Sequence, residues 1–331
     1  MLSLGIDTSN YKTSLSLVNT DGEIIYNYQQ FLDVPKGMRG LRQSDAFFQH
    51  VNRLDIPIRE AMKYRKEIGV VCVSSRPRPV DGSYMPCFLA GLQFAKTAAM
   101  ALDIPYFETS HQEGHIEAVK YYSELKSENR FICFHFSGGT TEAVLADSGK
   151  LEIVGGTKDI SYGQVIDRIG VRLGFDFPAG KYLDEIAIQS IDLRIKQGKS
   201  AKLLKPLKSD DGFLNLSGIE TQGQRAIDEL NKGSLSYDDS VCLLCGELFD
   251  KIGKSIIDIT VDVSKKCNEK KFLFAGGVSS SNYIRQYIKQ NMPKDIEYCF
   301  GRAELSTDNA VGTALIGGKK YGIKAGNGFS T

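Results

Sequence analysis

The chain has 331 residues, of which 42% are hydrophobic and 24% are charged, with a formal net charge of +1. This length exceeds what one hydrophobic core usually fills, so the sequence predicts two lobes with a cleft between them. The small net charge excludes strong attraction of a polyanion by the whole molecule. No stretch reaches the ~18 to 20 apolar residues of a membrane span, and the seven cysteines, an odd number, indicate reduced thiols in a cytoplasmic protein.

The N-terminal segment predicts a three-stranded meander, and the same layout recurs about 130 residues later. In both LSLGIDTSNYKTSLSLVNTDGEIIYNYQQF and FICFHFSGGTTEAVLADSGKLEIVGG, apolar runs are broken by polar and glycine-containing turns. The expected elements are a strand to Asp7, a turn over 7–12, strands over 13–18 and from Glu23, and later strands over 131–136, 141–146 and 151–154. Because one supersecondary unit occurs twice, the sequence predicts two related lobes.

Helical patterns follow each meander, which makes the fold class α/β with mixed sheets. Two of them run over 90–102 and 240–261, and the second contains Cys242 and Cys245 in an apolar stretch. Such a stretch favours a buried helix over a redox or metal site. Helices over 43–64 have apolar faces that suit either a partner protein or the lobe's own core.

A glycine pair, Gly276-Gly277, follows an apolar strand in KKFLFAGGVSSSNYIRQYI and precedes three serines that are candidate caps of the next helix. Glycine permits close approach of the backbone to a nucleotide, and helix amides face an anionic ligand. A glycine pair alone more often marks only a tight turn.

Two meanders followed by this element resemble the actin, hexokinase and Hsp70 superfamily, which has a two-lobed, ribonuclease-H-like fold with duplicated lobes. The resemblance implies a first lobe over 1–128, with a helix from 305–331 packing back on it, and a second lobe over 129–304. Lysine-rich helical patterns over about 181–240 predict an insertion in the second lobe.

Two of the four histidines stand four residues apart in TSHQEGHIEAV. This spacing places His111 and His115 on one face of a helix, where their ring nitrogens could converge on one metal ion. The alternative is a surface helix whose histidines form independent hydrogen bonds. A zinc-protease site is excluded, because Glu113 is rotated away from the position at which H-E-x-x-H carries its base.

A series of motifs in one order resembles the transferases that attach a threonylcarbamoyl group to adenosine 37 of tRNA, a family once labelled glycoproteases. They are GIDTSNYKTSLSLV, GLRQSDAFFQHV, HQEGH, FSGGTTEAV, YGQVIDRIGVRLGFDFPAG, LNLSGIETQGQRAI, FAGGVSSSN and STDNAVGTA. The resemblance covers nearly the whole chain. It implies an acyltransferase that moves the group from threonylcarbamoyl-AMP to N6 of the adenosine.

The resemblance also implies that His111, His115 and Asp308 hold one divalent ion, Fe(II) or Zn(II), with open coordination positions. Without it, Asp308 would be interpreted as the N-cap of a helix beginning near Asn309, and both roles can coexist. Asp7 in the first turn is the candidate base for the acceptor amine. Its alternative role is that of a capping residue in a tight turn.

An adenine-nucleotide site for threonylcarbamoyl-AMP or ATP is implied in the same way. Its residues are Phe136, Ser137, Gly138, Gly139, Thr140, Asp167, Gly180, Asp184, Gly277 and Asn282. Glycine amides suit a phosphate, carboxylates suit ribose hydroxyls, and an amide side chain suits a base edge. From the residues alone, Asp167 is instead the partner of a salt bridge one helical turn away.

The chain departs from the family pattern in its loops. Asn10, Tyr11 and Lys12 stand in place of Cys-Asp-Glu, Arg76 and Arg78 in place of a Gly-Pro-Gly loop, Thr140 in place of His, and Glu220 in place of Lys. The two arginines are candidate anion contacts, which suggests a different donor or acceptor.

The expected partners are tRNA, with help from partner proteins, and a paralogous protein of the same superfamily or a small ATPase. One alternative function is carbamoyl transfer to an acceptor other than tRNA. Others are a non-catalytic nucleotide-binding scaffold, against which the retained metal set argues, and an ATPase or kinase.

Overall fold

The computed structural model describes residues 1–9, 12–34, 41–197, 203–230 and 235–326. The chain forms two compact units, unit 1 from Met1–Lys126 with Glu304–Thr331 and unit 2 from Ser127–Ala303. The lobes expected from the sequence run over 1–128 with 305–331, and over 129–304. Asn10 and Tyr11, and residues 198–202 and 231–234 of the expected insertion, lie outside the described residues.

Unit 1 contains a five-stranded mixed sheet with the strand order β3-β2-β1-β4-β5. The strands are β1 Leu2–Thr8, β2 Lys12–Asn19, β3 Ile24–Phe31, β4 Ile68–Arg76 and β5 Tyr106–Ser110. The first three form an antiparallel meander, whereas β4 and β5 run parallel to β1. The carboxyl ends of β1, β4 and β5 therefore meet at one edge of the sheet, which is where ligands of such sheets usually bind.

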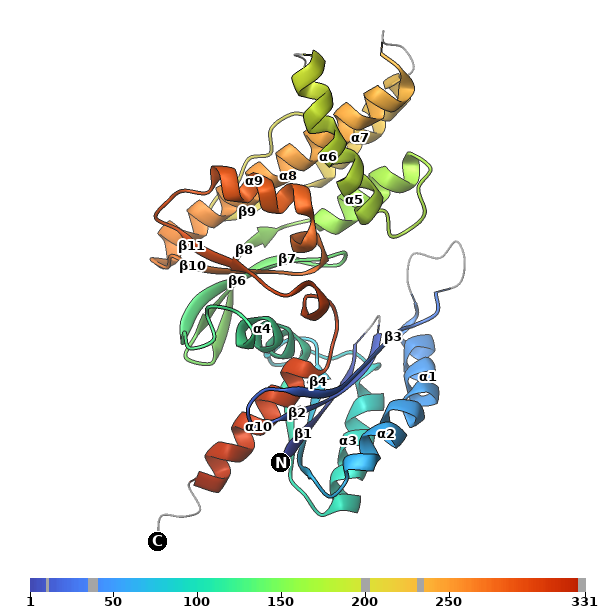
Figure 1. Cartoon of the computed structure of the whole chain (residues 1–331), viewed down its shortest axis with the longest axis vertical. Helices are drawn as coiled ribbons and strands as arrows, with labels where there is room; N and C mark the ends of the chain where they lie inside the picture. Colours follow the sequence, from blue (N-terminus) through green and yellow to red (C-terminus); the bar gives the residue numbers. More distant parts are fainter. Residues whose placement is uncertain (10–11, 35–40, 198–202, 231–234, 327–331) are drawn as a thin grey trace. The chain divides into compact units, whose positions relative to one another are not determined.

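Helices cover both faces of this sheet (Figure 1). They are α1 Gln43–Arg53, α2 Asp55–Ala61, α3 Phe88–Leu102, α4 His111–Tyr121 and α10 Val311–Gly326, with short 3-10 turns η1 Met62–Tyr64 and η4 Ala303–Leu305. One sheet face presents large apolar side chains, among them Leu4 and Ile6, which pack with Ala95 of α3 and Leu54 before α2. This face is the hydrophobic core of the unit.

The opposite face of β1 carries small residues and is covered by α10. Ser3 Oγ donates to the carbonyl of Ala314 at 2.6 Å, and a Cβ at Gly5 would lie 2.3 Å from the carbonyl oxygen of Ala310. The small side chains let the helix lie close to the strand.

A second close approach joins α10 to α4. A Cβ at Gly312 would lie 1.8 Å from the carbonyl oxygen of Gly114 and 2.6 Å from the amide nitrogen of Ala118. Only a glycine fits there, since real Cβ atoms do not come within such distances of the backbone. The segment before α10 is thereby brought beside the first turn of α4.

Unit 2 repeats the strand arrangement of unit 1. Its six-stranded sheet has the order β11-β10-β6-β7-β8-β9, with β6-β7-β8 as an antiparallel meander and β10 and β11 parallel to β6. The strands are β6 Arg130–Phe136, β7 Thr141–Asp147, β8 Lys150–Thr157, β9 Phe213–Leu214, β10 Lys271–Ala275 and β11 Glu297–Phe300. The order β8-β7-β6-β10-β11 matches β3-β2-β1-β4-β5, so the predicted duplication and α/β class are confirmed.

The helices of unit 2 are α5 Tyr162–Arg172, α6 Gly180–Gln197, α7 Ser217–Glu229, α8 Tyr237–Cys267 and α9 Asn282–Asn291, with the 3-10 turn η3 Gly277–Ser280. Cys245 is buried in α8 and Cys242 is partly buried, and both are free thiols, as the apolar stretch around them indicates. Within the described residues, none of the helices combines the length and apolarity needed to cross a membrane.

Candidate metal centre and nucleotide site

The two predicted histidines occupy the first and second turns of α4, whose start is fixed by a capping box. Ser110 Oγ accepts from the amide of Glu113 at 3.2 Å, and Glu113 Oε2 accepts from the amide of Ser110 at 2.7 Å. Glu113 is therefore a capping residue, which agrees with the exclusion of a protease site. The cap also fixes the backbone of His111, which is the first helical residue.

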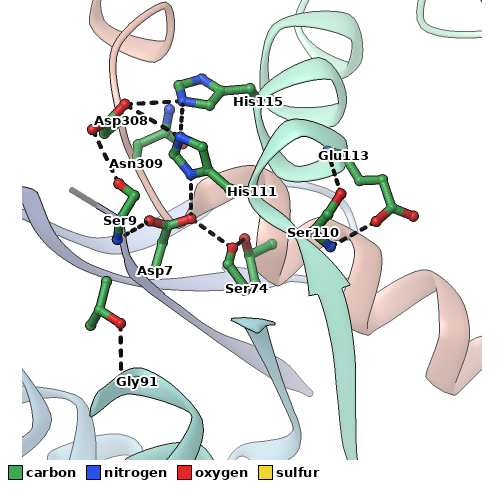
Figure 2. A network of polar contacts seen from close by, with 12 residues as sticks. Asp7, Ser9, Ser74, Gly91, Ser110, His111, Glu113, His115, Asp308 and Asn309 are labelled. Carbon is green, nitrogen blue, oxygen red and sulfur yellow. Dashed lines mark hydrogen bonds and ion pairs between the residues drawn. The ribbon is translucent and has the colours of Figure 1, made fainter. Parts of the chain in front are cut away.

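Three possible ligand atoms converge beside this helix (Figure 2). His115 Nε2 lies 3.0 Å from His111 Nε2 and 3.1 Å from Asp308 Oδ1, and His111 Nε2 lies 3.5 Å from the same oxygen. A first-row divalent ion holds such ligands at about 2.1 Å, and angles between 90° and 109° then separate them by about 3.0 to 3.4 Å. The triangle has the size of one face of a coordination polyhedron, so the residues fit a metal ion.

Asp7 lies behind His111 and is almost completely buried. Its Oδ2 accepts from His111 Nδ1 at 2.8 Å and from Ser74 Oγ at 2.6 Å, while Oδ1 accepts from the amide of Ser9 at 2.9 Å. A carboxylate that accepts from Nδ1–H leaves the lone pair on Nε2, facing the other two ligands. Both oxygens of Asp7 are thus occupied, so the structure favours a role in orienting His111 over the predicted role as a base.

The pKa values show that this cluster attracts positive charge. Burial lowers the pKa of His111, but the carboxylates of Asp7 and Asp308 outweigh it and raise the value to about 10. Burial raises the pKa of Asp308, but its hydrogen bonds to His111 and His115 hold the value well below the ordinary one. For Asp7, burial is likewise opposed, by the charge of His111, and the pKa is lowered. A metal ion would take the place of the proton that the imidazole otherwise holds.

Asp308 is held in a tightly bonded segment before α10. Ser9 Oγ donates to Asp308 Oδ2 at 3.1 Å. The helix begins at Val311, and Asn309 Oδ1 accepts from the amide of Val311 at 3.0 Å. The alternative interpretation of Asp308 as an N-cap is wrong, because its Oδ1 lies against His115 and its Oδ2 accepts from Ser9, while the amide at the start of the helix is bonded to Asn309 (Figure 2).

Two buried side chains near this centre were not assigned a role from the sequence. His50 of α1 is fully buried, with Nδ1 2.8 Å from Thr13 Oγ1 and Nε2 2.8 Å from the carbonyl oxygen of Ser9. Lys12, at the start of β2, donates to Thr307 Oγ1 at 2.8 Å. The sequence signal for Lys12 was the replacement of an acidic family loop by one that contains a lysine. The residues around His50 gave no signal for a role near this centre.

Arg76 and Arg78 lie at and beyond the end of β4. Arg76 is half-buried, with Nη1 3.4 Å from Ser75 Oγ, and the amide of Arg78 donates to Ser83 Oγ at 3.0 Å. The next residue after Arg76, Pro77, accepts from the amide of Gln112 in α4 at 3.0 Å. The loop is therefore attached beside the helix that carries the two histidines, and the predicted anion contact by the arginines stays a prediction.

In unit 2, the predicted phosphate loop is an exposed turn between β6 and β7. The amides of Gly139 and Thr140 point at Ser137 Oγ, at 3.4 and 3.1 Å, so a phosphate on these two amides would displace the Ser137 hydroxyl. Gly163 at the start of α5 packs on the turn, since its Cβ would lie 2.6 Å from the carbonyl oxygen of Ser137. The Phe136 ring is fully buried among aromatic rings, which leaves only its backbone for a ligand.

Two predicted nucleotide carboxylates are engaged at helix starts. Asp167 Oδ1 accepts from the amide of Ala179, just before α6, at 2.8 Å, and burial raises its pKa. The salt bridge expected within its own helix is not what holds Asp167. Asp184 accepts from Ser281 Oγ, from the amide of Asn282 at 3.0 Å and from the amide of Tyr283 at 3.1 Å. Both carboxylates therefore fix the backbone of predicted nucleotide contacts, at Gly180 and Asn282.

The last predicted contacts surround the end of β10. Gly276 has a positive φ of 96°, and its Cβ would lie 2.2 Å from the carbonyl oxygen of Phe136, so a glycine is needed where η3 passes the end of β6. Gly277 faces open space, and a Cβ added to it would meet nothing within 4 Å. Asn282 is exposed at the start of α9, where Ser281 Oγ caps the helix by accepting from Ile284 N at 3.1 Å.

Comparison with known proteins identifies the family. The family model described as tRNA N6-adenosine threonylcarbamoyltransferase matches residues 24–315. The chain belongs to this family. A relative named tRNA N6-adenosine threonylcarbamoyltransferase, from Clostridium perfringens, is 27% identical over 332 residues, covering 96% of this chain and 91% of its own. Family membership confirms the predicted enzyme class, a transferase.

Solved structures confirm the fold at much lower identity. Full-length HypF in a phosphate- and nucleotide-bound form aligns with a TM-score of 0.58 and 13% identity, over 96% of this chain and 46% of that one. The activator of 2-hydroxyisocaproyl-CoA dehydratase from Clostridium difficile aligns with a TM-score of 0.54 and 12% identity, over 99% of this chain and 98% of that one. These likenesses support the predicted superfamily fold.

Proposed function

We propose that this protein transfers a threonylcarbamoyl group from threonylcarbamoyl-AMP to N6 of adenosine 37 in tRNA. The observation that carries the proposal is the convergence of His111 Nε2, His115 Nε2 and Asp308 Oδ1 within 4.8 Å, in a chain of this transferase family. A protein that had lost the reaction and kept only the fold would have no need for this partly buried arrangement.

The residues around the centre determine how the three ligands are presented. Asp7 holds His111 with Nε2 toward the centre, and Ser9 holds Asp308 Oδ2, so that Oδ1 remains available. A bound Fe(II) or Zn(II) would supply Lewis acidity and an anchor for the donor. The preformed arrangement avoids the entropic cost of assembling ligands when the donor arrives.

The chemistry requires no covalent nucleophile from the protein, because the donor is already activated. The N6 nitrogen attacks the carbamoyl carbon, the bond from that carbon to the phosphate oxygen breaks with its electron pair going to AMP, and the proton released from N6 passes to solvent water. AMP is a good leaving group, so the protein's task is to align the reactants and stabilise the separating phosphate. Because both oxygens of Asp7 are occupied, we assign it to orientation of His111 rather than to this proton transfer.

The donor nucleotide is assigned to unit 2. The amides of the 137–140 turn would receive phosphate, and the exposed Asn282 would contact the nucleoside. The seven cysteines are all free thiols, which supports a reducing, cytoplasmic setting. The small net charge of +1 supports help from partner proteins in binding tRNA, among them a paralogous protein or a small ATPase.

The deciding experiment incubates the purified protein with threonylcarbamoyl-AMP and tRNA that lacks the modification, with candidate partner proteins supplied, and analyses the nucleosides by mass spectrometry. We expect threonylcarbamoyladenosine with the wild type and none with His111→Ala. Glu117→Gln is the matched control, because Glu117 lies on the same helix but pairs with Lys319. Unmodified tRNA under every combination would refute the proposal.

A second candidate is carbamoyl transfer to an acceptor other than tRNA, which Arg76 and Arg78 favour. They place two guanidinium groups in a loop attached to α4 through Pro77 and Gln112, and guanidinium groups suit carboxylate or phosphate acceptors. Consumption of threonylcarbamoyl-AMP by small carboxylate or phosphate acceptors, in the absence of tRNA, would favour this candidate.

A further inference from the structure

Lys12 is a buried lysine whose ammonium group contacts the metal-binding segment. The residue is 6% exposed. Its Nζ donates to Thr307 Oγ1 at 2.8 Å and to Gln29 Oε1 at 3.0 Å, and it lies 4.5 Å from the centre of the Phe31 ring. Two hydrogen bonds and a cation–π contact account for the ammonium group, so Lys12 is held in one place rather than left for an anionic ligand.

These contacts join parts of the chain that are far apart in sequence. Gln29 and Phe31 belong to β3, which pairs with β2, whereas Thr307 lies 295 residues from Lys12. Burying an ammonium group is costly unless it is hydrogen-bonded. An apolar residue would fill the same space without this desolvation penalty. Packing alone therefore does not explain a lysine at this position.

Thr307 immediately precedes Asp308 and is fixed from two sides. Lys12 holds its hydroxyl, and Asn309 Nδ2 donates to its carbonyl oxygen at 2.7 Å. These two bonds restrict the backbone that carries the Asp308 carboxylate, and Ser9 holds one of its oxygens as well. Metal ligands tolerate displacements of only about 0.2 Å. Loss of the Lys12 hydrogen bond to Thr307 would therefore shift Asp308 Oδ1 enough to weaken metal binding.

We propose that Lys12 is a positioning residue of the metal centre, which holds Asp308 in place through Thr307. This inference rests on the proposed metal centre but not on the transfer reaction. It assigns a role to a position at which the chain departs from the acidic residue of the family pattern.

Two competing explanations predict different outcomes. If Lys12 acted only through its charge, its removal would strengthen binding of a divalent cation, because a positive charge nearby repels the ion. If Lys12 served only to stabilise the fold, its removal would lower the unfolding temperature of the metal-free protein and leave the metal affinity unchanged.

The test measures the dissociation constant for Co(II), by competition with a chelator and by the ligand-field absorption of the bound ion. The variants are Lys12→Met, which keeps the length of the side chain, Thr307→Val, which keeps its shape, and the two combined. Gln29→Met is the matched control, since it removes the other hydrogen bond of Lys12 and leaves the contact with Thr307. His111→Ala defines binding at the centre.

We expect Lys12→Met and Thr307→Val each to raise the dissociation constant about 10-fold or more, the usual effect of losing a supporting contact. The double variant should bind like either single variant, and Gln29→Met should stay within about twofold of the wild type. Unchanged or tighter binding by Lys12→Met, or losses that add in the double variant, would overturn the role. Thr307→Val tests the same link if Lys12→Met does not fold. Wild-type binding that is insensitive to His111→Ala would refute the metal centre itself, whatever the transfer assay shows.

Discussion

Substitution of Gly312 tests whether the packing of α10 on α4 fixes the relative positions of the three proposed metal ligands. A Cβ at this position would lie 1.8 Å from the carbonyl oxygen of Gly114, whereas ordinary van der Waals contact begins at 3.4 Å. Gly312→Ala must therefore move the helices apart by about 1.6 Å unless the backbone deforms, several times the tolerance of a metal site. Overpacking of this kind costs about 1 to 3 kcal/mol.

Gly322→Ala supplies the control on the same helix. A Cβ added at Gly322 would meet nothing within 4 Å, so only the helix propensity changes, and alanine should stabilise by about 0.5 to 1 kcal/mol. The assay is urea unfolding together with Co(II) titration. We expect Gly312→Ala to lower stability by about 2 kcal/mol and metal affinity at least 10-fold, and Gly322→Ala to leave the affinity unchanged. Wild-type metal affinity in Gly312→Ala would refute the reasoning.

Further predictions concern the second layer of the centre and the fold of unit 2. Asp7→Asn keeps one acceptor oxygen for His111 and Ser74, but it removes the charge and loses the acceptor of the Ser9 amide, so Co(II) titration should show about 10-fold weaker binding. Burial lowers the pKa of His50 from 6.5 to about 4. Between pH 6.5 and pH 4 the unfolded chain therefore binds a proton at His50 that the folded chain does not bind. The free energy of unfolding should fall as the pH falls, by up to about 3 kcal/mol at about pH 4. Urea unfolding from pH 7 to pH 4 should show this loss of stability in the wild type but not in His50→Gln. An equal dependence of the free energy of unfolding on pH in both proteins would contradict the prediction. Gly276→Ala should destabilise the protein by about 2 kcal/mol or more, because of its positive φ and its contact with Phe136, whereas Gly277→Ala should be nearly neutral in the same measurement.

The duplicated sheet was predictable because its signals are local. Strand alternation and glycine-containing turns located the predicted strands to within three residues, as for β8, which was expected over 151–154 and spans Lys150–Thr157. The long helix α8 extends beyond the expected 240–261 to Tyr237–Cys267. Ser236 caps its start by accepting from the amide of Asp239, and Asn268 ends it in the left-handed conformation. Helix ends depend on such caps, which the apolar pattern does not contain.

The contacts that support the proposed metal site were not predictable, because they join distant parts of the chain. The pair His111 and His115 is visible from spacing alone, but Ser74 meets Asp7 across 67 positions and Ser9 meets Asp308 across 299. Small hydroxyl residues in strands and turns give no local sign of such partners. Their assignment required the sheet order, which brings β1 and β4 together with the segment before α10.

The departures from the family pattern differ in how the structure accommodates them. Glu220, where the pattern has lysine, forms an ion pair with Arg168 at 2.8 Å and accepts from Gln224 at 2.8 Å, so its charge is matched within unit 2. Lys12 is instead held by neutral partners, because its ammonium group donates hydrogen bonds to Thr307 and Gln29 beside the proposed metal centre. Replacing a buried, hydrogen-bonded charged side chain by one of opposite charge destabilises the fold, because its partners are left unpaired.

Arg76 differs from these two residues, because its hydrogen bond is a long one, 3.4 Å to the neighbouring Ser75 hydroxyl. Within the part of the chain that the structure describes, this is the hydrogen bond of the half-buried guanidinium group, which has five N–H donors and so retains donors for a ligand. Changes that affect the substrate should therefore be sought at Arg76, whereas Lys12 and Glu220 maintain structure that any substrate would require. Substitution of Arg76 by Gly should accordingly alter the choice of acceptor and leave Co(II) binding intact, the reverse of the pattern expected for Lys12→Met.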